Sequence, residues 1–254
     1  MAFIHAPAED PCGPLLIPVP NHYVEKQPTH TPILTPVTLP NLHSFRFRGV
    51  STYLEVLVHR ITTPRLEKLE IDFFNQLTFS VPRLLQFMNT TKNLRFESAK
   101  FLFSGEHVSV EVYPCGEAEM YAFFISINCC QLGWQVSSVA QIFNLLGQIF
   151  SSVAHLTLKH EVHSLSSEEH NEVDRARWHK LLRLFSNVKT LRIALGLVEE
   201  LSRCLELDDG ELPSELLPKL QELTYSESGN TGDAFASFID ARRNAGHPVV
   251  LTRY

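Results

Sequence analysis

Histidine is the residue type that points most directly to chemistry in this sequence, because the stretch HLTLKHEVHSLSSEEH holds His155, His160, His163 and His170. A zinc protease uses two histidines at i and i+4 on one helix face, with a glutamate between them. In HEVH the histidines are only three residues apart, at the end of an expected strand, where residues i and i+3 point to opposite faces. We therefore interpret them as solvated loop histidines. A metal-dependent enzyme using the cluster at 155–170 is the less favoured alternative.

Other signals for catalysis are similarly poor. The sequence contains no G-x-S-x-G, P-loop or G-x-G-x-x-G motif. The acidic run LELDDGE, residues 205–211, lacks the regular oxygen spacing of a calcium loop, which favours a solvated turn. Cys129 and Cys130 follow an expected strand without a basic neighbour, so we interpret them as inert thiols. The sequence thus predicts a protein that is not an enzyme and has no cofactor and no metal site.

Charged residues on the outward side of expected strands are more informative. If the strands align, Arg46, Glu70 and Arg95 form one row, and Arg48, Asp72 and Glu97 form the next. Neighbouring strands are about 4.8 Å apart, so these side chains touch. They form either a ladder of ion pairs within the protein, each pair contributing roughly 0–1 kcal/mol to stability, or a recognition surface on a concave face. The ladder is favoured. The candidate protein-binding face comprises Arg46, Arg48, Glu70, Asp72, Arg95, Glu97 and Arg192.

A short repeated pattern positions these residues. TPRLEKLEI, beginning at Thr63, places apolar residues at i, i+3 and i+5, as do LPNLHSFRF, SNVKTLRI and LPKLQELTY. The first apolar position falls at Leu42, Leu66, Thr91 (a polar variant), Val153, Val188 and Leu220. The gap from Thr91 to Val153 is about twice the others, and YAFFISIN in its middle reads as a further buried strand. PVVLTRY, from Pro248, is the last unit, which makes eight expected strands.

Helical segments fall between these strands. They are STYLEVLVHRI, SVPRLLQFMNT, SSVAQIFNLLGQIF, EVDRARWHKLLRLF, GLVEELSRCLEL and DAFASFIDARRNAG. Recurring strand and helix units indicate a solenoid, in which stacked repeats bury a common core. The sequence predicts an irregular leucine-rich-repeat-like α/β solenoid, with a mostly parallel sheet and helices on the other side. An antiparallel meander near 97–128 is expected as an insertion on the side of this solenoid.

Composition defines the domain organisation. Residues 1–38 are rich in proline and predict an extended or disordered arm, and residues 39–254 predict the solenoid domain. The net charge of -6 and the absence of a basic block argue against a nucleic-acid partner. No stretch is apolar enough for a membrane span, and the N-terminus does not read as a secretory signal. Five cysteines without metal spacing indicate reduced thiols and an intracellular protein, in cytoplasm or nucleus.

Several long segments resemble the C-terminal repeat region of mushroom-type fungal F-box proteins. They include LPNLHSFRFRGVSTYLEVL, HNEVDRARWHKLLRLFSNVKTLRIALGLVEELSRCLELDDGE and SFIDARRNAGHPV. The resemblance implies a substrate-selecting role beside a ubiquitin ligase, with an unknown protein partner. The F-box itself is not expected in this chain, because residues 1–38 are too few and too rich in proline to form one. LPSELLPKL, residues 212–220, imitates only the opening of an F-box and already leads into a strand. Docking to a Skp-type linker is therefore not expected, and a truncated or degenerate paralogue without a ligase link is the alternative.

Overall fold

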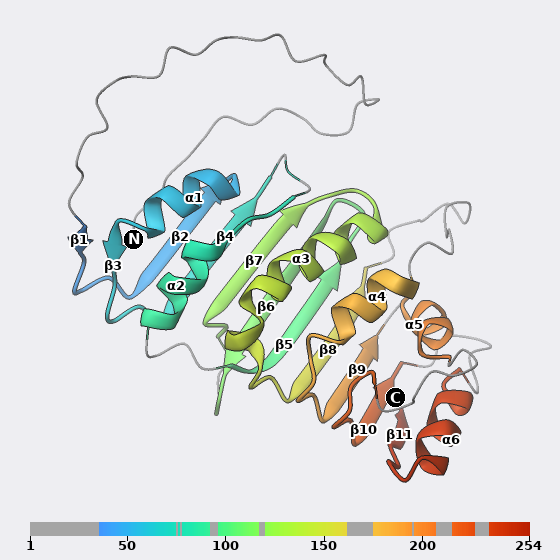
Figure 1. The fold of residues 1–254 in the computed structure, drawn as a ribbon. Helices are drawn as coiled ribbons and strands as arrows, with labels where there is room; N and C mark the ends of the chain where they lie inside the picture. The colour runs from blue at the N-terminus through green and yellow to red at the C-terminus, as the bar shows by residue number, and fades with distance from the viewer. Residues whose placement is uncertain are drawn as a thin grey trace.

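The structure is a computed structural model with a mixed α/β fold (Figure 1). It describes residues 36–74, 76, 78–91, 96–116, 120–161, 175–194, 196–206, 215–226 and 234–254.

A nine-stranded sheet runs through the molecule, and within it only β6 is antiparallel to its neighbours. The order across the sheet is β11 (Val250–Arg253), β10 (Glu222–Tyr225), β9 (Thr190–Ala194), β8 (His155–His160), β5 (Phe96–Phe103), β6 (His107–Pro114), β7 (Phe123–Asn128), β4 (Lys68–Phe73) and β2 (Ser44–Gly49). A separate short sheet pairs β1 (Val37–Thr38) with β3 (Ile61–Thr62). The strands expected from the repeated pattern are present where they are described, and the one that follows Thr91 is described only from Phe96, where β5 begins. The mostly parallel sheet is confirmed.

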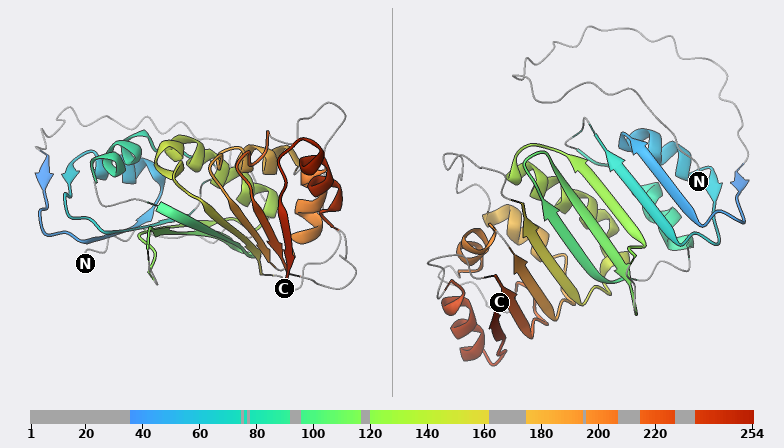
Figure 2. Two further views of the ribbon diagram at one scale, coloured as in Figure 1. Left: turned by 90° about the horizontal axis from the view of Figure 1, so that it is seen from below. Right: turned by 180° about the vertical axis from the view of Figure 1, so that it is seen from behind.

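The helices lie on one side of this sheet, as Figure 2 shows. They are α1 (Ser51–Val58), α2 (Pro82–Thr90), α3 (Leu132–Phe150), α4 (Arg175–Leu182), α5 (Val198–Leu205) and α6 (Ala236–Asn244). Each overlaps a segment with the expected helical pattern. α6 ends where Gly246 adopts a positive φ of 81°, a backbone conformation that glycine adopts without steric cost. Phe235 occupies the N-cap position of α6.

The strands do not stack in simple chain order. After β4 and α2 the chain passes two sheet positions to form β5, and then returns through β6 and β7, which pairs with β4. The long helix α3 then leads from β7 to β8, which pairs with β5. The antiparallel meander near 97–128 is present, but it occupies the middle of the sheet instead of a side of the fold. The leucine-rich-repeat assignment stays a prediction.

The core lies between the sheet and the helices. The last two apolar residues of the repeated pattern are buried on four strands: Leu69 and Ile71 on β4, Leu156 and Leu158 on β8, Leu191 and Ile193 on β9, and Leu223 and Tyr225 on β10. Aromatic rings fill the middle of the core. The ring centre of Phe143 on α3 lies 5.3 Å from that of Phe101 on β5 and 4.5 Å from that of Phe150. Buried residues from β2 at one end to Val249 at the other form one continuous cluster.

The N-terminal arm expected over residues 1–38 is described only from residue 36. Val37 and Thr38 form β1 there, so the last residues of the expected arm belong to a strand. The prediction for residues 1–35 concerns a part of the chain outside the described residues.

Candidate functional site

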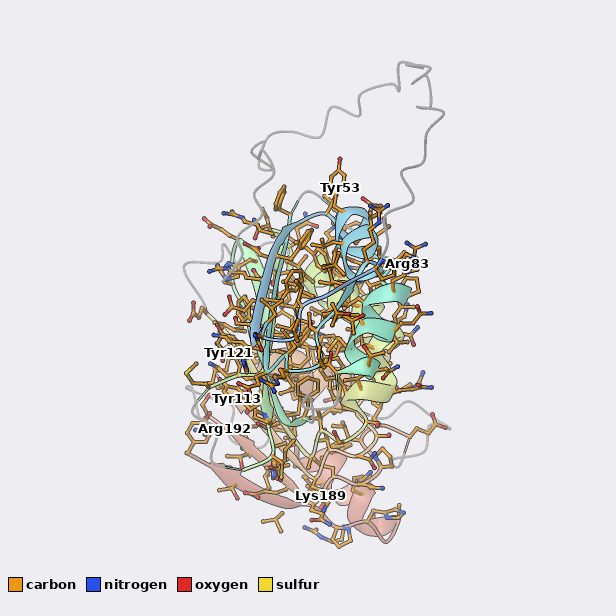
Figure 3. The ribbon with its side chains drawn as sticks, turned by 90° about the vertical axis from the view of Figure 1, so that its left-hand side faces the viewer. Tyr53, Arg83, Tyr113, Tyr121, Lys189 and Arg192 are labelled. Atoms are coloured by element: carbon orange, nitrogen blue, oxygen red, sulfur yellow. The ribbon has the colours of Figure 1, made fainter. Side chains whose placement is uncertain are left out.

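The sheet surface opposite the helices, here called the open face, is the candidate functional site (Figures 2 and 3). Figure 3 shows Tyr113, Tyr121 and Arg192 on this face, whereas Arg83 lies on the helix side. Strand register places one outward row across all nine strands. Its members are Arg46, Glu70, Phe124, Glu111, Lys100, Thr157, Arg192, Thr224 and Thr252.

Two of the predicted cross-strand pairs are ion pairs in the structure. Arg46 lies directly opposite Glu70, with 3.3 Å between Arg46 Nε and Glu70 Oε2. Arg48 lies opposite Asp72, with 3.2 Å between Arg48 Nε and Asp72 Oδ2. The alternation of β2 and β4 therefore predicted both the face and the register of these four residues correctly.

The remaining predicted members of these rows lie elsewhere. Because β7 lies beside β4, the residues opposite Glu70 and Asp72 are Phe124 and Ser126. Glu97 is on β5, three strands from β4, at an irregular step in the pairing of β5 with β6, and its carboxylate accepts a hydrogen bond from the Gly116 amide. Its expected place beside Asp72 is thus wrong. Arg95 lies outside the described residues.

The two carboxylates of the β2–β4 pairs differ in their surroundings. Burial raises the pKa of Glu70, but hydrogen bonds from Lys68 and Tyr121 outweigh it, so the pKa lies below its usual value. Burial also raises the pKa of Asp72, and the charges of Arg48 and Arg46 offset this only in part, so the pKa lies above its usual value.

A second polar group, formed by Lys100, Glu111 and Tyr113, lies where β5 and β6 pair. The Lys100 ammonium and the Tyr113 hydroxyl both donate a hydrogen bond to Glu111 Oε2, and each donor–acceptor distance is 2.7 Å. Burial raises the pKa of Glu111, but the bonds from Lys100 and Tyr113 and the charges of Lys100 and Lys159 bring it below its usual value. Burial and the Glu111 carboxylate raise the pKa of Tyr113 to about 12.

Lys100, Glu111 and Tyr113 were missed in the sequence, although a signal for the pairing of Lys100 with Glu111 exists. Lys100 and Glu111 are equidistant from the tight turn at Gly105 and Glu106, and an antiparallel hairpin pairs residues that are equidistant from its turn. The position of this turn therefore specifies the ion pair of Lys100 with Glu111.

Two further cations lie on β8 and β9. Arg192 of β9 is exposed, and its guanidinium lies 4.3 Å from the centre of the Tyr254 ring. Lys159 of β8 is half-buried on the same face. Among the described residues, no carboxylate forms an ion pair with Lys159 or Arg192. Glu222 of β10 projects from the same face, so this part of the open face carries charges of both signs.

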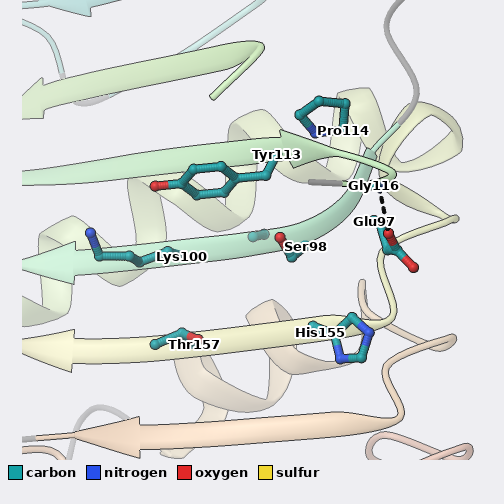
Figure 4. Close-up of a pocket in the computed structure, with 9 residues that line it drawn as sticks. Glu97, Ser98, Lys100, Tyr113, Pro114, Gly116, His155 and Thr157 are labelled. Atoms are coloured by element: carbon teal, nitrogen blue, oxygen red, sulfur yellow. Dashed lines mark hydrogen bonds between the residues drawn. The ribbon is translucent and has the colours of Figure 1, made fainter. Parts of the chain in front are cut away.

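A hollow of about 490 Å³ opens on this face between β5, β6 and β8 (Figure 4). Its lining is polar and comprises Glu97, Ser98, Lys100, Tyr113, His155 and Thr157, together with Ala99, Pro114 and Gly116. The lining side chains that could ionise already have partners inside the protein. His155 Nδ1 lies 3.2 Å from Thr190 Oγ1, for example. The hollow is thus an open, polar depression of the surface.

The histidine cluster does not form a metal site in the described residues. His155 is exposed on the open face, whereas His160, five residues further along β8, is buried on the other side. His163 and His170, like most of the acidic run at 205–211, lie outside the described residues. Within the described ranges, no group of three or more His, Cys, Asp or Glu side chains could hold a metal ion.

The segment at 212–220 is part of the core where it is described. Leu216, Leu217 and Leu220 are buried, with at most 6% of any one of them exposed. Among the described helices, none is long and apolar enough to cross a membrane. The expectation that this chain does not dock to a Skp-type linker stays a prediction.

Comparison of the whole chain with models of protein families, with curated proteins and with solved structures gave no match.

Proposed function

We propose that this protein is a non-catalytic protein-binding module that binds its partner with the open face of the sheet. One observation carries the proposal: the helices lie on one side of the nine-stranded sheet and leave a broad, polar surface on the other. Such a surface combines rigid strands with side chains that project in regular rows. It holds arginine and aromatic side chains, which are enriched in protein interfaces.

A leucine-rich-repeat-like origin of the fold is part of the same proposal. It is supported by the repeated pattern that ends in the inward pairs of β4, β8, β9 and β10. The resemblance to the repeat region of F-box proteins gives the open face a substrate-selecting role. The candidate residues Arg46, Arg48, Glu70, Asp72 and Arg192 all project from it.

Variants that block the open face test this function. Thr157 lies in the hollow near the middle of the face, so Thr157→Trp would fill the surface without removing a core side chain. Gln86→Trp on the exposed side of α2 is the matched control, because it adds the same ring to the helix side. Each full-length protein would serve as bait in affinity purification with quantitative mass spectrometry, after circular dichroism has shown equal folding.

We expect specific partners of the wild type to be lost with Thr157→Trp and retained with Gln86→Trp. If the partners stay bound to Thr157→Trp and are lost from Gln86→Trp, the binding surface is on the helix side, and the proposal is wrong. Partners that are retained by both variants would also contradict binding across the middle of the open face.

A further inference from the structure

Helix α1 is apolar on its outward side as well as on the side that faces the core. Leu54 and Val58 are buried, whereas Tyr53 is 66% exposed and Val56 is 47% exposed. Figure 3 views the molecule from the side of β2 and shows Tyr53 projecting from α1. Thr52 is the single polar side chain among the exposed residues of this helix. Because a helix that is apolar on all sides is normally buried on all sides, the outward side of α1 calls for a cover.

The charged residue of α1 does not serve this outward side. The Glu55 carboxylate accepts hydrogen bonds from the backbone amides of Arg83, over 2.8 Å, and Leu84, over 2.9 Å, at the start of α2. Glu55 therefore faces α2, and the exposed residues of α1 carry no charge.

Other helices on the same side of the sheet have polar outward sides. The neighbouring helix α2 exposes Arg83, Gln86 and Asn89. Helix α6, at the far end of the sheet, exposes Asp240 and Arg243 (Figure 1). The outward apolar pair on α1 is thus a local feature of the β2 end of the fold.

The chain enters the described structure at this same end. The backbone amide of Val37 on β1 donates a hydrogen bond to the carbonyl oxygen of Arg60, two residues after α1 ends at Val58. The side chain of Val37 is also 52% exposed. Residues 1–35, which precede this point, are therefore tethered close to α1.

These preceding residues contain an apolar run, PLLIPVP, at positions 14–20. Four of its seven residues are aliphatic, namely Leu15, Leu16, Ile17 and Val19. An extended chain from residue 20 to residue 36 spans up to about 50 Å, whereas a helix as short as α1 is about 12 Å long. The run can therefore reach every part of α1.

We propose that residues 14–20 pack on the outward side of α1 and cover Tyr53 and Val56. The prolines of the run have no backbone N–H, so it cannot extend the sheet beside β2 as a regular strand, and it binds through its side chains. A tethered segment has an effective concentration of about a millimolar, which favours it over a second copy or another protein at a lower concentration. The contact lies on the helix side of the sheet, so it is independent of the function proposed for the open face.

Photo-crosslinking in the full-length protein tests this contact. p-Benzoylphenylalanine replaces Tyr53, whose exposed position accommodates the larger ring, and links to nearby C–H groups on illumination. Because Lys26 is the first lysine or arginine of the chain, trypsin releases residues 1–26 as one peptide, in which fragment spectra locate the linked residue. We expect linkage to residues 14–20 within one chain. The same amino acid at Gln86, on the exposed side of α2, is the control for random collisions of the tethered segment and should give little of this linkage.

Two double variants test whether the run itself makes the contact. Leu16→Asp with Ile17→Asp places two charges in the proposed contact, and Asn21→Asp with Gln27→Asp adds the same two charges outside the run. We expect the first double variant to lower the yield of linkage from position 53 about tenfold, as the loss of one buried aliphatic side chain implies. The second should leave the yield unchanged.

The proposal is overturned if position 53 links mainly to residues outside 14–20, or to a second copy in a dimer-sized product, or forms no link at all. It is also overturned if position 86 links to residues 14–20 as efficiently as position 53. Equal yields from the two double variants would have the same meaning, since the contact would then not depend on the apolar run.

Discussion

Glu70 and Asp72 occupy equivalent positions in the sequence pattern, each opposite an arginine of β2, and the structure makes them physically different. Glu70 has three donors, Arg46, Lys68 and Tyr121, so its charged form is stabilised in the folded state. Asp72 has Arg48 as its ion-pair partner, and burial outweighs the attraction. The carboxylate of Glu70 should therefore stabilise the fold, whereas the carboxylate of Asp72 should contribute little.

The prediction at this scale is that Glu70→Gln lowers the free energy of unfolding at pH 7 by about 1–2 kcal/mol, because its donors lose a charged acceptor. Asp72→Asn should change it by less than about 0.5 kcal/mol. The pKa of Glu70 is lower in the folded than in the unfolded state, so its contribution exists above the unfolded value and is lost as the pH falls through the folded value.

Urea unfolding at pH 7 and at about pH 3.5 measures both effects. The difference between the wild type and Glu70→Gln should shrink at the lower pH, because the wild-type carboxyl is then increasingly protonated. An equal loss of stability from Glu70→Gln and Asp72→Asn at pH 7 would show that the two carboxylates are equivalent after all.

At the scale of elements, the repeated pattern predicts each strand and helix but not which strands become neighbours. Apolar residues at i, i+3 and i+5 fix the inward side of a strand, and this information is the same whichever strand lies beside it. The same limit applies to the candidate site. Arg46 with Glu70 and Arg48 with Asp72 were predictable because β2 and β4 are consecutive units. Glu97 was misplaced because β7, not β5, follows β4 in the sheet.

The place of β6 was nevertheless visible in its composition. Val108, Val110 and Val112 alternate along it and are all fully buried. A strand with one apolar face of this kind has to cover a core, so it belongs within the main sheet, between the two strands to which its turns connect it.

Helix α3 stabilises the strand order in which β7, and not β5, lies beside β4. It does so because it connects β7 to β8 and packs over the central strands. Phe143 is its central contact, with rings of Phe101, Phe150 and Phe185 within 6.0 Å. Phe143→Ala should lower the free energy of unfolding by about 3–5 kcal/mol, through lost burial and the cavity left behind. Leu145→Ala on the same helix is the control, since Leu145 is 37% exposed, and it should cost less than about 1 kcal/mol. Equal effects in chemical denaturation would contradict the role given to Phe143.

At the scale of the whole molecule, the sheet order predicts how the fold opens from its ends. Local opening that starts at β2 and β4 uncovers β7 next, although β5 is the next strand of the main sheet in the chain. Opening that starts at β11 and proceeds through β8 uncovers β5 next. If the strands stacked in chain order, opening from the N-terminal end would reach β5 before β7. The order in which backbone amides lose protection therefore separates the two arrangements.

Native-state hydrogen exchange on two variants measures this order. Phe45→Ala weakens the β2 end, because Phe45 is buried against Phe87 of α2, and Leu223→Ala weakens the β10 end. We expect Phe45→Ala to reduce protection in β2 and β4, then in β7, and last in β5. Leu223→Ala should affect β5 before β7. If β5 lost protection before β7 when the β2 end is weakened, the observed strand order, with β7 beside β4, would be contradicted. A uniform loss across all strands would show that the sheet opens only as a single unit, as its one continuous core permits.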